Sequence, residues 1–338
     1  MIQYNYDNID RVLFVGDIHG EFLELFNIIK YGISSNNKRK RKGEQQGYNN
    51  SIIIVAGDCG FGFNKLTYYE QIFSDFEKLL EASNTHVIFV RGNHDDPSYF
   101  SEKKIDLPNI KCVPDYSIIS TKSKNVLCIG GGISVDRIWR KQKEVRINRF
   151  RTNEESKKKL YWENEPIVED LEAINEIIKN KIKIDAIVTH SAPDFAYPYA
   201  KDTSLSWFRV DDKLKEDIEQ ERTALSNIFH LLEEKEALPF IWVYGHFHKN
   251  WEEFHKGTFF RLLSDDIRIM DVFDIANRRK REQEERESII AKDKFTFDEW
   301  FFNHVVSSVE ENKIVKIDDN SNDDESLDVE VFDEEVIF

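Results

Sequence analysis

Five short runs of polar, metal-coordinating residue types each follow an apolar run of strand length, and this repeated order constrains the fold more than any other feature. The apolar runs cover residues 12–15, 52–56, 87–90, 186–188 and 241–244. The motifs that follow them are Gly16-Asp17-Ile18-His19-Gly20, Gly57-Asp58, Gly92-Asn93-His94-Asp95, Thr189-His190 and Gly245-His246-Phe247-His248. In layered α/β proteins, functional groups gather beyond the carboxyl ends of buried strands. The motifs are therefore predicted to meet at one site.

Length and composition favour a globular enzyme. The chain has 338 residues and is 40% hydrophobic, which is enough for a sizeable core. No apolar stretch approaches the roughly 18 residues that cross a bilayer, and the N-terminus lacks a secretory pattern. The three cysteines, Cys59, Cys112 and Cys128, have no metal-binding spacing and fit reduced, packed thiols. We therefore expect a cytoplasmic protein, without a membrane span, that binds any metal through oxygen and nitrogen.

The formal charge of −16 is unevenly distributed. Residues 310–338 contain twelve acidic and two basic side chains. Residues 137–159 contain ten basic and three acidic side chains. An anionic ligand responds to such a local basic patch more than to the distant acidic tail. The patch therefore leaves nucleotide or nucleic-acid binding open, although a solvated basic helix is the plainer interpretation.

Apolar spacing predicts several helices and further strands. Phe22, Leu25, Phe26 and Ile29 predict a helix directly after the first motif. Similar spacing predicts helices over 72–80, 166–180 and 221–235, and apolar runs predict a strand over 126–129 and a strand or hairpin over 253–263. Three successive glycines at 130–132 indicate that the backbone approaches either another element or a substrate.

The pattern predicts three regions along the chain. These are a main domain over residues 1–275, a charged helical extension over 276–316 and an acidic, mobile tail over 317–338. Residues 34–50 lack apolar periodicity and predict an exposed loop insertion whose basic run is either solvated or a nucleic-acid contact. The acidic tail is a candidate contact for a protein partner, and nothing in the pattern indicates an oligomeric state.

Taken together, the five motifs resemble the signature of the calcineurin-like metallophosphoesterase superfamily. That signature reads Asp-x-His, Gly-Asp, Gly-Asn-His-Asp/Glu, His and Gly-His-x-His, and all five blocks occur here within roughly residues 11–275. The resemblance implies a four-layer α/β sandwich, in which two mixed β-sheets are flanked by helices. The predicted strands and helices are compatible with this fold, but periodicity alone does not distinguish it from a doubly wound sheet.

The resemblance also implies two divalent metal ions. One set of ligands would be Asp17, His19, Asp58 and His248, and the other Asp58, Asn93, His190 and His246. Asp58 would bridge the ions, because a carboxylate can span two cations whereas an imidazole nitrogen cannot. Ligation by oxygen and nitrogen suits Mn²⁺, Fe, Zn²⁺ or Ni²⁺. We expect Mn²⁺ first.

The implied function is hydrolysis of a phosphodiester or phosphomonoester. Two such ions lower the pKa of a bridging water and clamp phosphate oxygens, so that a metal-bridging hydroxide attacks phosphorus in line. By the same resemblance, His94 is not a ligand but the general acid near the leaving-group oxygen, and Asp95 would help to hold it charged. The basic segment 137–159 favours a nucleotide or oligonucleotide as substrate.

The sequence departs from the resemblance directly after Asp58. Serine/threonine protein phosphatases of this superfamily have an arginine there that grips the phosphate, whereas this chain has Cys59-Gly60-Phe61. We therefore expect Arg137 to contact the phosphate, with a surface salt bridge to Asp136 or a nearby acid as the alternative. Cys59 is either a packed thiol or a redox switch. A protein phosphatase and a non-catalytic binding module on this scaffold remain the alternative functions.

Overall fold

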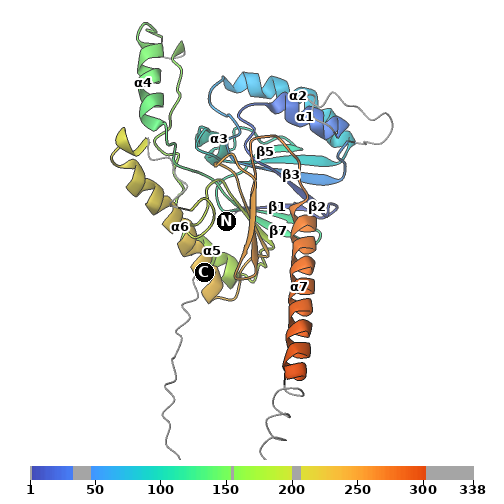
Figure 1. Ribbon diagram of the computed structural model, residues 1–338. Helices are drawn as coiled ribbons and strands as arrows, with labels where there is room; N and C mark the ends of the chain where they lie inside the picture. Colours follow the sequence, from blue (N-terminus) through green and yellow to red (C-terminus); the bar gives the residue numbers. More distant parts are fainter. Residues whose placement is uncertain (1, 33–46, 154–155, 200–206, 302–338) are drawn as a thin grey trace, which may run out of the picture. The chain divides into compact units, whose positions relative to one another are not determined.

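A computed structural model describes residues 2–32, 47–153, 156–199 and 207–301, with side chains to residue 290 (Figure 1). The chain divides into two units, Met1–Arg278 and Arg279–Phe338. The acidic tail and most of the predicted loop insertion lie outside the described residues. The predicted boundary at residue 275 falls inside a helix, α7 (Val272–Phe301).

Two β-sheets form the centre of the first unit. The large sheet has seven strands in the order β1-β6-β7-β8-β9-β11-β10, and the small sheet has four in the order β2-β3-β4-β5. The large sheet contains β1 (Ile2–Tyr6), β6 (Ser117–Thr121), β7 (Asn125–Ile129), β8 (Ala186–Thr189), β9 (Ile241–Tyr244), β10 (Trp251–His255) and β11 (Thr258–Leu262). The small sheet contains β2 (Arg11–Val15), β3 (Ser51–Ala56), β4 (Thr85–Val90) and β5 (Ile110–Cys112).

The strand directions bring the ends of the motif-bearing strands together. In the small sheet every strand pair is parallel, with Val15 opposite Val55 and Ala56 opposite Val90. In the large sheet β7, β8, β9 and β11 run parallel, whereas the pairs β6–β7 and β10–β11 are antiparallel. The predicted two-sheet fold is confirmed, but only the large sheet is mixed. The carboxyl ends of β2, β3 and β4 thus share one edge, as do those of β8 and β9.

Helices cover the outer face of each sheet, which gives four layers (Figure 1). The small sheet packs against α1 (Phe22–Tyr31) and α2 (Leu66–Ala82), and the large sheet packs against α5 (Leu171–Lys179) and α6 (Leu214–Glu234). The remaining helical elements before α7 are α3 (Ser98–Ser101), α4 (Arg137–Asn148) and the 3₁₀ helix η3 (Trp207–Arg209). None of the helices in the described residues is long and apolar enough to span a membrane.

Alternation along the strands separates the layers of the core. In β2, Leu13 and Val15 face the α1/α2 side, whereas Val12 and Phe14 face the large sheet. Because both faces of the small sheet are covered, its strands are apolar at nearly every position. Each fully buried aliphatic side chain contributes about 1.5–3 kcal/mol. The core therefore fixes the strand ends from which the motifs project.

Some helix boundaries and edge strands differ from the prediction. The helix predicted over 166–180 begins only at Leu171, because the Asp170 carboxylate caps it by accepting the Ala173 backbone N–H at 2.8 Å. The helix predicted over 221–235 begins earlier, at Leu214. The sequence pattern also missed strands β1, β5 and β6. The predicted hairpin over 253–263 is present as β10 and β11.

Candidate metal centre

The five motifs meet where the two sheets come together. Asp17, Asp58 and Asn93 follow β2, β3 and β4 of the small sheet. His190 and His246 follow β8 and β9 of the large sheet. The small sheet thus supplies the oxygen donors, and the large sheet supplies imidazole nitrogens. The site depends on both sheets, so the packing of the sheets against each other sets its geometry.

Two motif glycines are required because ligands lie directly against them. A Cβ atom on Gly92 would lie 2.2 Å from Asp58 Oδ1. A Cβ atom on Gly245 would lie 2.2 Å from Asp17 Oδ1. A side chain on Gly92 would displace Asp58, which follows the neighbouring strand, and a side chain on Gly245 would displace Asp17, which follows a strand of the other sheet. This explains why glycine precedes the ligand in these motifs.

The backbone holds several ligands in an uncommon conformation. His19, Asp58, His246 and His248 have φ values of 45°, 46°, 70° and 51°. Residues other than glycine adopt this left-handed region at a cost of about 1–3 kcal/mol each, and such residues concentrate at functional sites. The surrounding structure therefore stabilises a backbone conformation that is unfavourable locally but positions these side chains in the site.

One group of ligands, which we call the outer group, consists of Asp17, His19 and His248, with Asp58 beside them. One ligand atom from each of these four residues lies within 4.8 Å of all the others. The Nε2 atoms of His19 and His248 are 3.1 Å apart, and His248 Nε2 is 3.2 Å from Asp17 Oδ2. The His19 and His248 side chains are 34% and 47% exposed. This group therefore faces solvent.

A second group, the inner group, consists of Asn93, His190 and His246. His190 Nε2 lies 2.9 Å from Asn93 Oδ1 and 3.1 Å from Asp58 Oδ1. The other ring nitrogen, Nδ1, is 2.8 Å from the carbonyl oxygen of Ala56. Because a carbonyl only accepts hydrogen bonds, Nδ1 carries a proton and Nε2 is the ligand atom. The His246 ring lies beside that of His190, with centroids 4.9 Å apart.

The carboxylate of Asp58 faces both groups. Its Oδ1 atom is 3.1 Å from His190 Nε2 in the inner group, and its Oδ2 atom is 3.9 Å from His19 Nδ1 in the outer group. The backbone N–H of His94 donates to Oδ1 at 2.7 Å and fixes the carboxylate. One buried side chain thus joins the two ligand groups.

The charges of the site favour a cation. Burial alone would raise the pKa of Asp58, but His190 and His94 outweigh it and hold the pKa well below its ordinary value. Burial likewise opposes protonation of His190, yet Asp58 and Asp17 raise its pKa to about 10. Burial and the charge on His190 lower the pKa of His246 to about 3. The carboxylates therefore create a strongly negative local field, which a divalent cation would satisfy.

The types of donor atom suit divalent cations of hard or borderline character. It consists of two carboxylates, one amide oxygen and four imidazoles, without a thiolate. Cys59 follows Asp58 but is fully buried, and its thiol donates to the carbonyl oxygen of Val90. Burial raises the pKa of this thiol well above its ordinary value, which agrees with a packed thiol.

Comparison with protein families decides the assignment. The family model for calcineurin-like phosphoesterases matches residues 10–250, which is more than half of the chain. This chain belongs to the calcineurin-like phosphoesterase family. No curated protein sequence matches it.

The solved structures that match this chain share little sequence with it. The phosphopantetheinyl hydrolase from Mycobacterium tuberculosis has 13% identity and a TM-score of 0.32, over 76% of this chain and 90% of that one. A cold-active protein-tyrosine phosphatase from a psychrophilic Shewanella species has 14% identity and a TM-score of 0.30, over 78% of this chain and 73% of that one.

The Asp95 side chain contacts backbone N–H groups and not the His94 ring. Its buried carboxylate accepts the backbone N–H groups of Cys59, Gly60, Phe61 and Gly92 at 2.7–3.0 Å. No hydrogen bond or ion pair joins Asp95 to His94 among the described residues. The half-buried His94 ring lies near His19, with centroids 5.5 Å apart. Asp95 therefore holds together the loops that carry Asp58 and Asn93.

Arg137 is engaged by two carboxylates. It is the first residue of α4, and its Nε and Nη1 atoms lie 2.5 Å from Asp211 Oδ2 and 2.6 Å from Asp217 Oδ2. These are the salt bridges of the alternative interpretation, and the contact to phosphate stays a prediction. Hydrogen bonding to Asp211 and Asp217 raises the pKa of Arg137 further.

Sequence reasoning missed three buried residues that support Asn93. The Ser134 hydroxyl lies 2.7 Å from Glu165 Oε2, and it accepts from Asn93 Nδ2 at 2.9 Å and from Arg140 Nη1 at 2.6 Å. These contacts turn the Asn93 amide so that its oxygen faces His190. The three successive glycines were a partial indication in the sequence that this segment lies close to the site. A Cβ atom on Gly132 would lie 3.0 Å from His190 and 3.3 Å from Asn93. The glycines thus approach another element.

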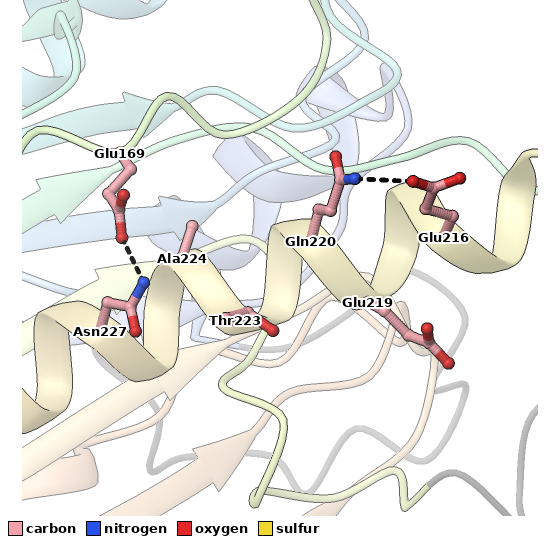
Figure 2. Close-up of a pocket in the computed structure, with 7 residues that line it drawn as sticks. All are labelled: Glu169, Glu216, Glu219, Gln220, Thr223, Ala224 and Asn227. Carbon is pink, nitrogen blue, oxygen red and sulfur yellow. Dashed lines mark hydrogen bonds between the residues drawn. The ribbon is translucent and has the colours of Figure 1, made fainter.

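A surface depression beside α6 is lined by residues other than these ligands (Figure 2). Figure 2 shows Gln220 bonded to Glu216, and Asn227 bonded to Glu169 across the depression. Three glutamates line it, and none of the metal ligands does. Carboxylates repel a phosphate ester, so this depression is not a candidate for the substrate.

Proposed function

We propose that this protein is a two-metal phosphoesterase that hydrolyses a phosphodiester or phosphomonoester. The observation that carries the proposal is the position of Asp58, whose two carboxylate oxygens face different groups of imidazoles. A carboxylate placed in this way suits two cations about 3.5–4 Å apart, the arrangement found in phosphatases and nucleases. Mn²⁺ is the first candidate, with Fe, Zn²⁺ and Ni²⁺ as alternatives.

The proposed ligands hold the two cations and fix their positions. When bound, the two cations supply Lewis acidity toward phosphate oxygens and lower the pKa of water. Asp58 is positioned by the His94 backbone N–H, and Asp17 by the His246 backbone N–H, which lies 3.1 Å from both of its carboxylate oxygens. These contacts fix both carboxylates before substrate arrives, so little reorganisation is needed during the reaction.

His94 is the proposed general acid. Its ring is half-buried beside His19, and burial lowers its pKa although the charge of Asp58 opposes that shift. It follows Asn93 directly, so its imidazole is held at the rim of the centre while its backbone is tied to Asp58. We assign it delivery of a proton to the leaving-group oxygen, a role worth about 10²–10⁴-fold in rate.

Arg140 is the arginine that we expect to contact the phosphate. It is 3% exposed, and its Nη1 donates to the Ser134 hydroxyl and, at 3.4 Å, to the Asn93 carbonyl. Its buried Nη2 has no hydrogen-bond partner among the described residues. A phosphate oxygen would satisfy that donor, whereas Arg137 already has carboxylate partners.

A protein phosphatase is disfavoured as an alternative. The loop after Asp58 has no arginine, and Phe61 of that loop is buried in the core. A non-catalytic scaffold would have lost ligands or His94, and all of them are present. The hydrolytic function is therefore the better supported one.

Metal-dependent hydrolysis tests the proposal directly. The full chain is stripped with a chelator, reloaded with Mn²⁺, Zn²⁺, Fe²⁺ or Ni²⁺, and assayed with p-nitrophenyl phosphate and bis(p-nitrophenyl) phosphate. We expect hydrolysis only after reloading. No hydrolysis of either ester with any metal would contradict the proposal and favour the scaffold.

The role of His94 is tested through the leaving group. We expect His94→Ala to lower kcat by about 10²–10⁴-fold for alkyl phosphate esters, which need a proton on departure. The loss should be much smaller for p-nitrophenyl esters, because p-nitrophenolate leaves without one. His230→Ala, at an exposed histidine on α6, is the control. Equal losses for both kinds of ester would show that His94 is not the acid.

A further inference from the structure

A pocket of about 290 Å³ adjoins the metal centre. Its lining includes His246, a proposed ligand, and Phe247, the next residue in the same motif. Trp207 and Phe208 of η3 and Glu221 of α6 form other walls. The volume is close to the lower end of the roughly 300–1,000 Å³ that small-molecule sites occupy. A molecule whose phosphate lies on the metal ligands would therefore have space for an organic group here.

Aromatic side chains, two of them partly exposed, line this pocket. Trp207 and Phe208 are partly exposed, and neither ring contacts another aromatic ring among the described residues. Phe247 packs at its edge against Tyr244, with the rings at 77° to each other. Large apolar rings left partly open to solvent cost free energy unless something covers them. A flat aromatic group is the occupant that such walls favour.

The pocket also offers one buried acceptor without a donor. Glu221 is 5% exposed, and both Glu221 and Ser191 line the pocket. The Oε2 atom of Glu221 has no hydrogen-bond partner among the described residues. A buried acceptor that lacks a donor is unfavourable, so a ligand N–H would stabilise it. The occupant should therefore carry an N–H group on its ring.

The arginine of the pocket is not available for a second phosphate. Arg222 lines the pocket, but its guanidinium donates to backbone carbonyl oxygens at 2.6–3.2 Å. The carbonyls belong to Ala192, Pro193, Ala196 and Pro198. The Arg222 guanidinium also lies 5.8 Å from the centre of the Phe247 ring. Arg222 thus shapes the wall, because its guanidinium is already engaged by backbone carbonyls.

We propose that this pocket binds the nucleobase of a nucleotide or oligonucleotide substrate. Trp207 and Phe208 provide the stacking surface, and Glu221 Oε2 accepts a base N–H. The inference rests on the proposed function, because the phosphate of the same molecule lies at the metal centre. It deepens that function by naming the class of ester.

Nucleoside binding tests the pocket without hydrolysis. Adenosine, guanosine and cytidine are titrated into the metal-free full chain, with binding followed by calorimetry and ligand-observed NMR. N6,N6-dimethyladenosine is the matched ligand, because it keeps the ring but has no amino N–H. We expect saturable binding of at least one nucleoside. Lack of binding by all three at millimolar concentration would overturn the proposal.

Variants of the pocket identify which wall binds the base. Trp207→Ala should weaken nucleoside binding by roughly 5- to 150-fold, the range given by stacking on one aromatic side chain. Trp207→Phe keeps a ring and should retain most of the affinity. Glu221→Leu should bind adenosine and its dimethyl analogue equally, whereas the natural chain prefers adenosine about fivefold or more. Unchanged affinity in Trp207→Ala would overturn the stacking role.

Two further measurements separate folding and catalysis from base binding. Thermal unfolding shows whether each variant is folded, and Phe208→Leu provides a second stacking variant if Trp207→Ala is not. Hydrolysis of glycerol phosphate, which has no ring, should be unchanged in all of them. Nucleoside binding without hydrolysis of any ester would contradict the proposed function and leave the pocket supported. Hydrolysis of ringless esters without nucleoside binding would support the proposed function and contradict the binding of a nucleobase in the pocket.

Discussion

The outer and inner ligand groups share Asp58 but differ in how far the protein fixes them. In the outer group, the side chains of His19 and His248 are 34% and 47% exposed. In the inner group, the His190 side chain is fully buried and Asn93 is 2% exposed. Burial limits the number of positions that a side chain can adopt. The two cations should therefore be held with different strength.

The partners behind the ligands differ in the same way. His190 is anchored to the Ala56 carbonyl at 2.8 Å, and Asn93 is anchored to the Ser134 hydroxyl at 2.9 Å. Among the described residues, the partner behind His248 is Asp265, whose side chain is 47% exposed and lies 3.6 Å from His248 Nδ1. Such supporting contacts orient ligands and strengthen metal binding. The inner group is thus arranged in advance, whereas the two histidines of the outer group depend more on the cation itself.

Asp58→Asn should have the largest effect, because it removes the charge shared by both groups. We expect kcat to fall by roughly 10³-fold or more, since each cation contributes several kcal/mol to stabilisation of the transition state. Metal content measured by plasma mass spectrometry should fall from two ions per chain. Asp10→Asn, at an exposed carboxylate paired with Lys124, is the control. Two tightly bound ions and normal activity in Asp58→Asn would exclude a bridging role.

The contrast between the groups predicts that two histidine variants respond differently to added metal. His190→Gln should lose about 10²–10³-fold in kcat, and excess Mn²⁺ should not restore it, because a buried site tolerates little rearrangement. His248→Gln should lose activity at low Mn²⁺ and recover much of it at high Mn²⁺. The measurement is activity against Mn²⁺ concentration for both variants. Identical curves would show that the two groups do not differ.

Much of this arrangement could be predicted from the sequence, because each motif directly follows a buried strand. The strands before Asp17, Asp58 and Asn93 are apolar on both faces, which marks them clearly as central strands. Strands β1 and β6 have a weaker sequence signal. Strand β1 alternates between partly buried and exposed residues, and Ser117 and Ser120 interrupt the apolar pattern of β6. Local propensity is weak for such segments.

The supporting residues could not be predicted, because only the tertiary fold brings them together. Glu165 precedes α5, and nothing near it in the sequence indicates that it bonds to Ser134, which lies 31 residues earlier. Arg137 and Arg140 lie on the same helix, yet one faces Asp211 and the other faces Ser134. The sequence shows that Arg137 and Arg140 lie close together on the chain, and only the structure shows which of them is close to Asn93.

The two arginines can be compared in matched variants. Arg140→Lys keeps the charge but loses the fork of donors, so kcat/KM for phosphate esters should fall by about 10- to 100-fold, mostly through KM. Arg137→Lys should leave kcat/KM nearly unchanged and lower the free energy of unfolding by about 1–3 kcal/mol, because it weakens the pairs with Asp211 and Asp217. The opposite pattern would restore Arg137 as the phosphate contact.

Ser134→Ala should give the smallest effect on catalysis and the most specific one. Loss of the hydroxyl frees the Asn93 amide, so its oxygen no longer faces His190 in every molecule, and affinity for the inner cation should fall by about 10- to 100-fold. At saturating Mn²⁺, kcat should return close to that of the natural chain. Ser123→Ala, at an exposed hydroxyl beside Asp10, is the control. If Ser134→Ala instead weakened the outer cation, the assignment of Asn93 to the inner group would be wrong, because Ser134 contacts no residue of the outer group among those described.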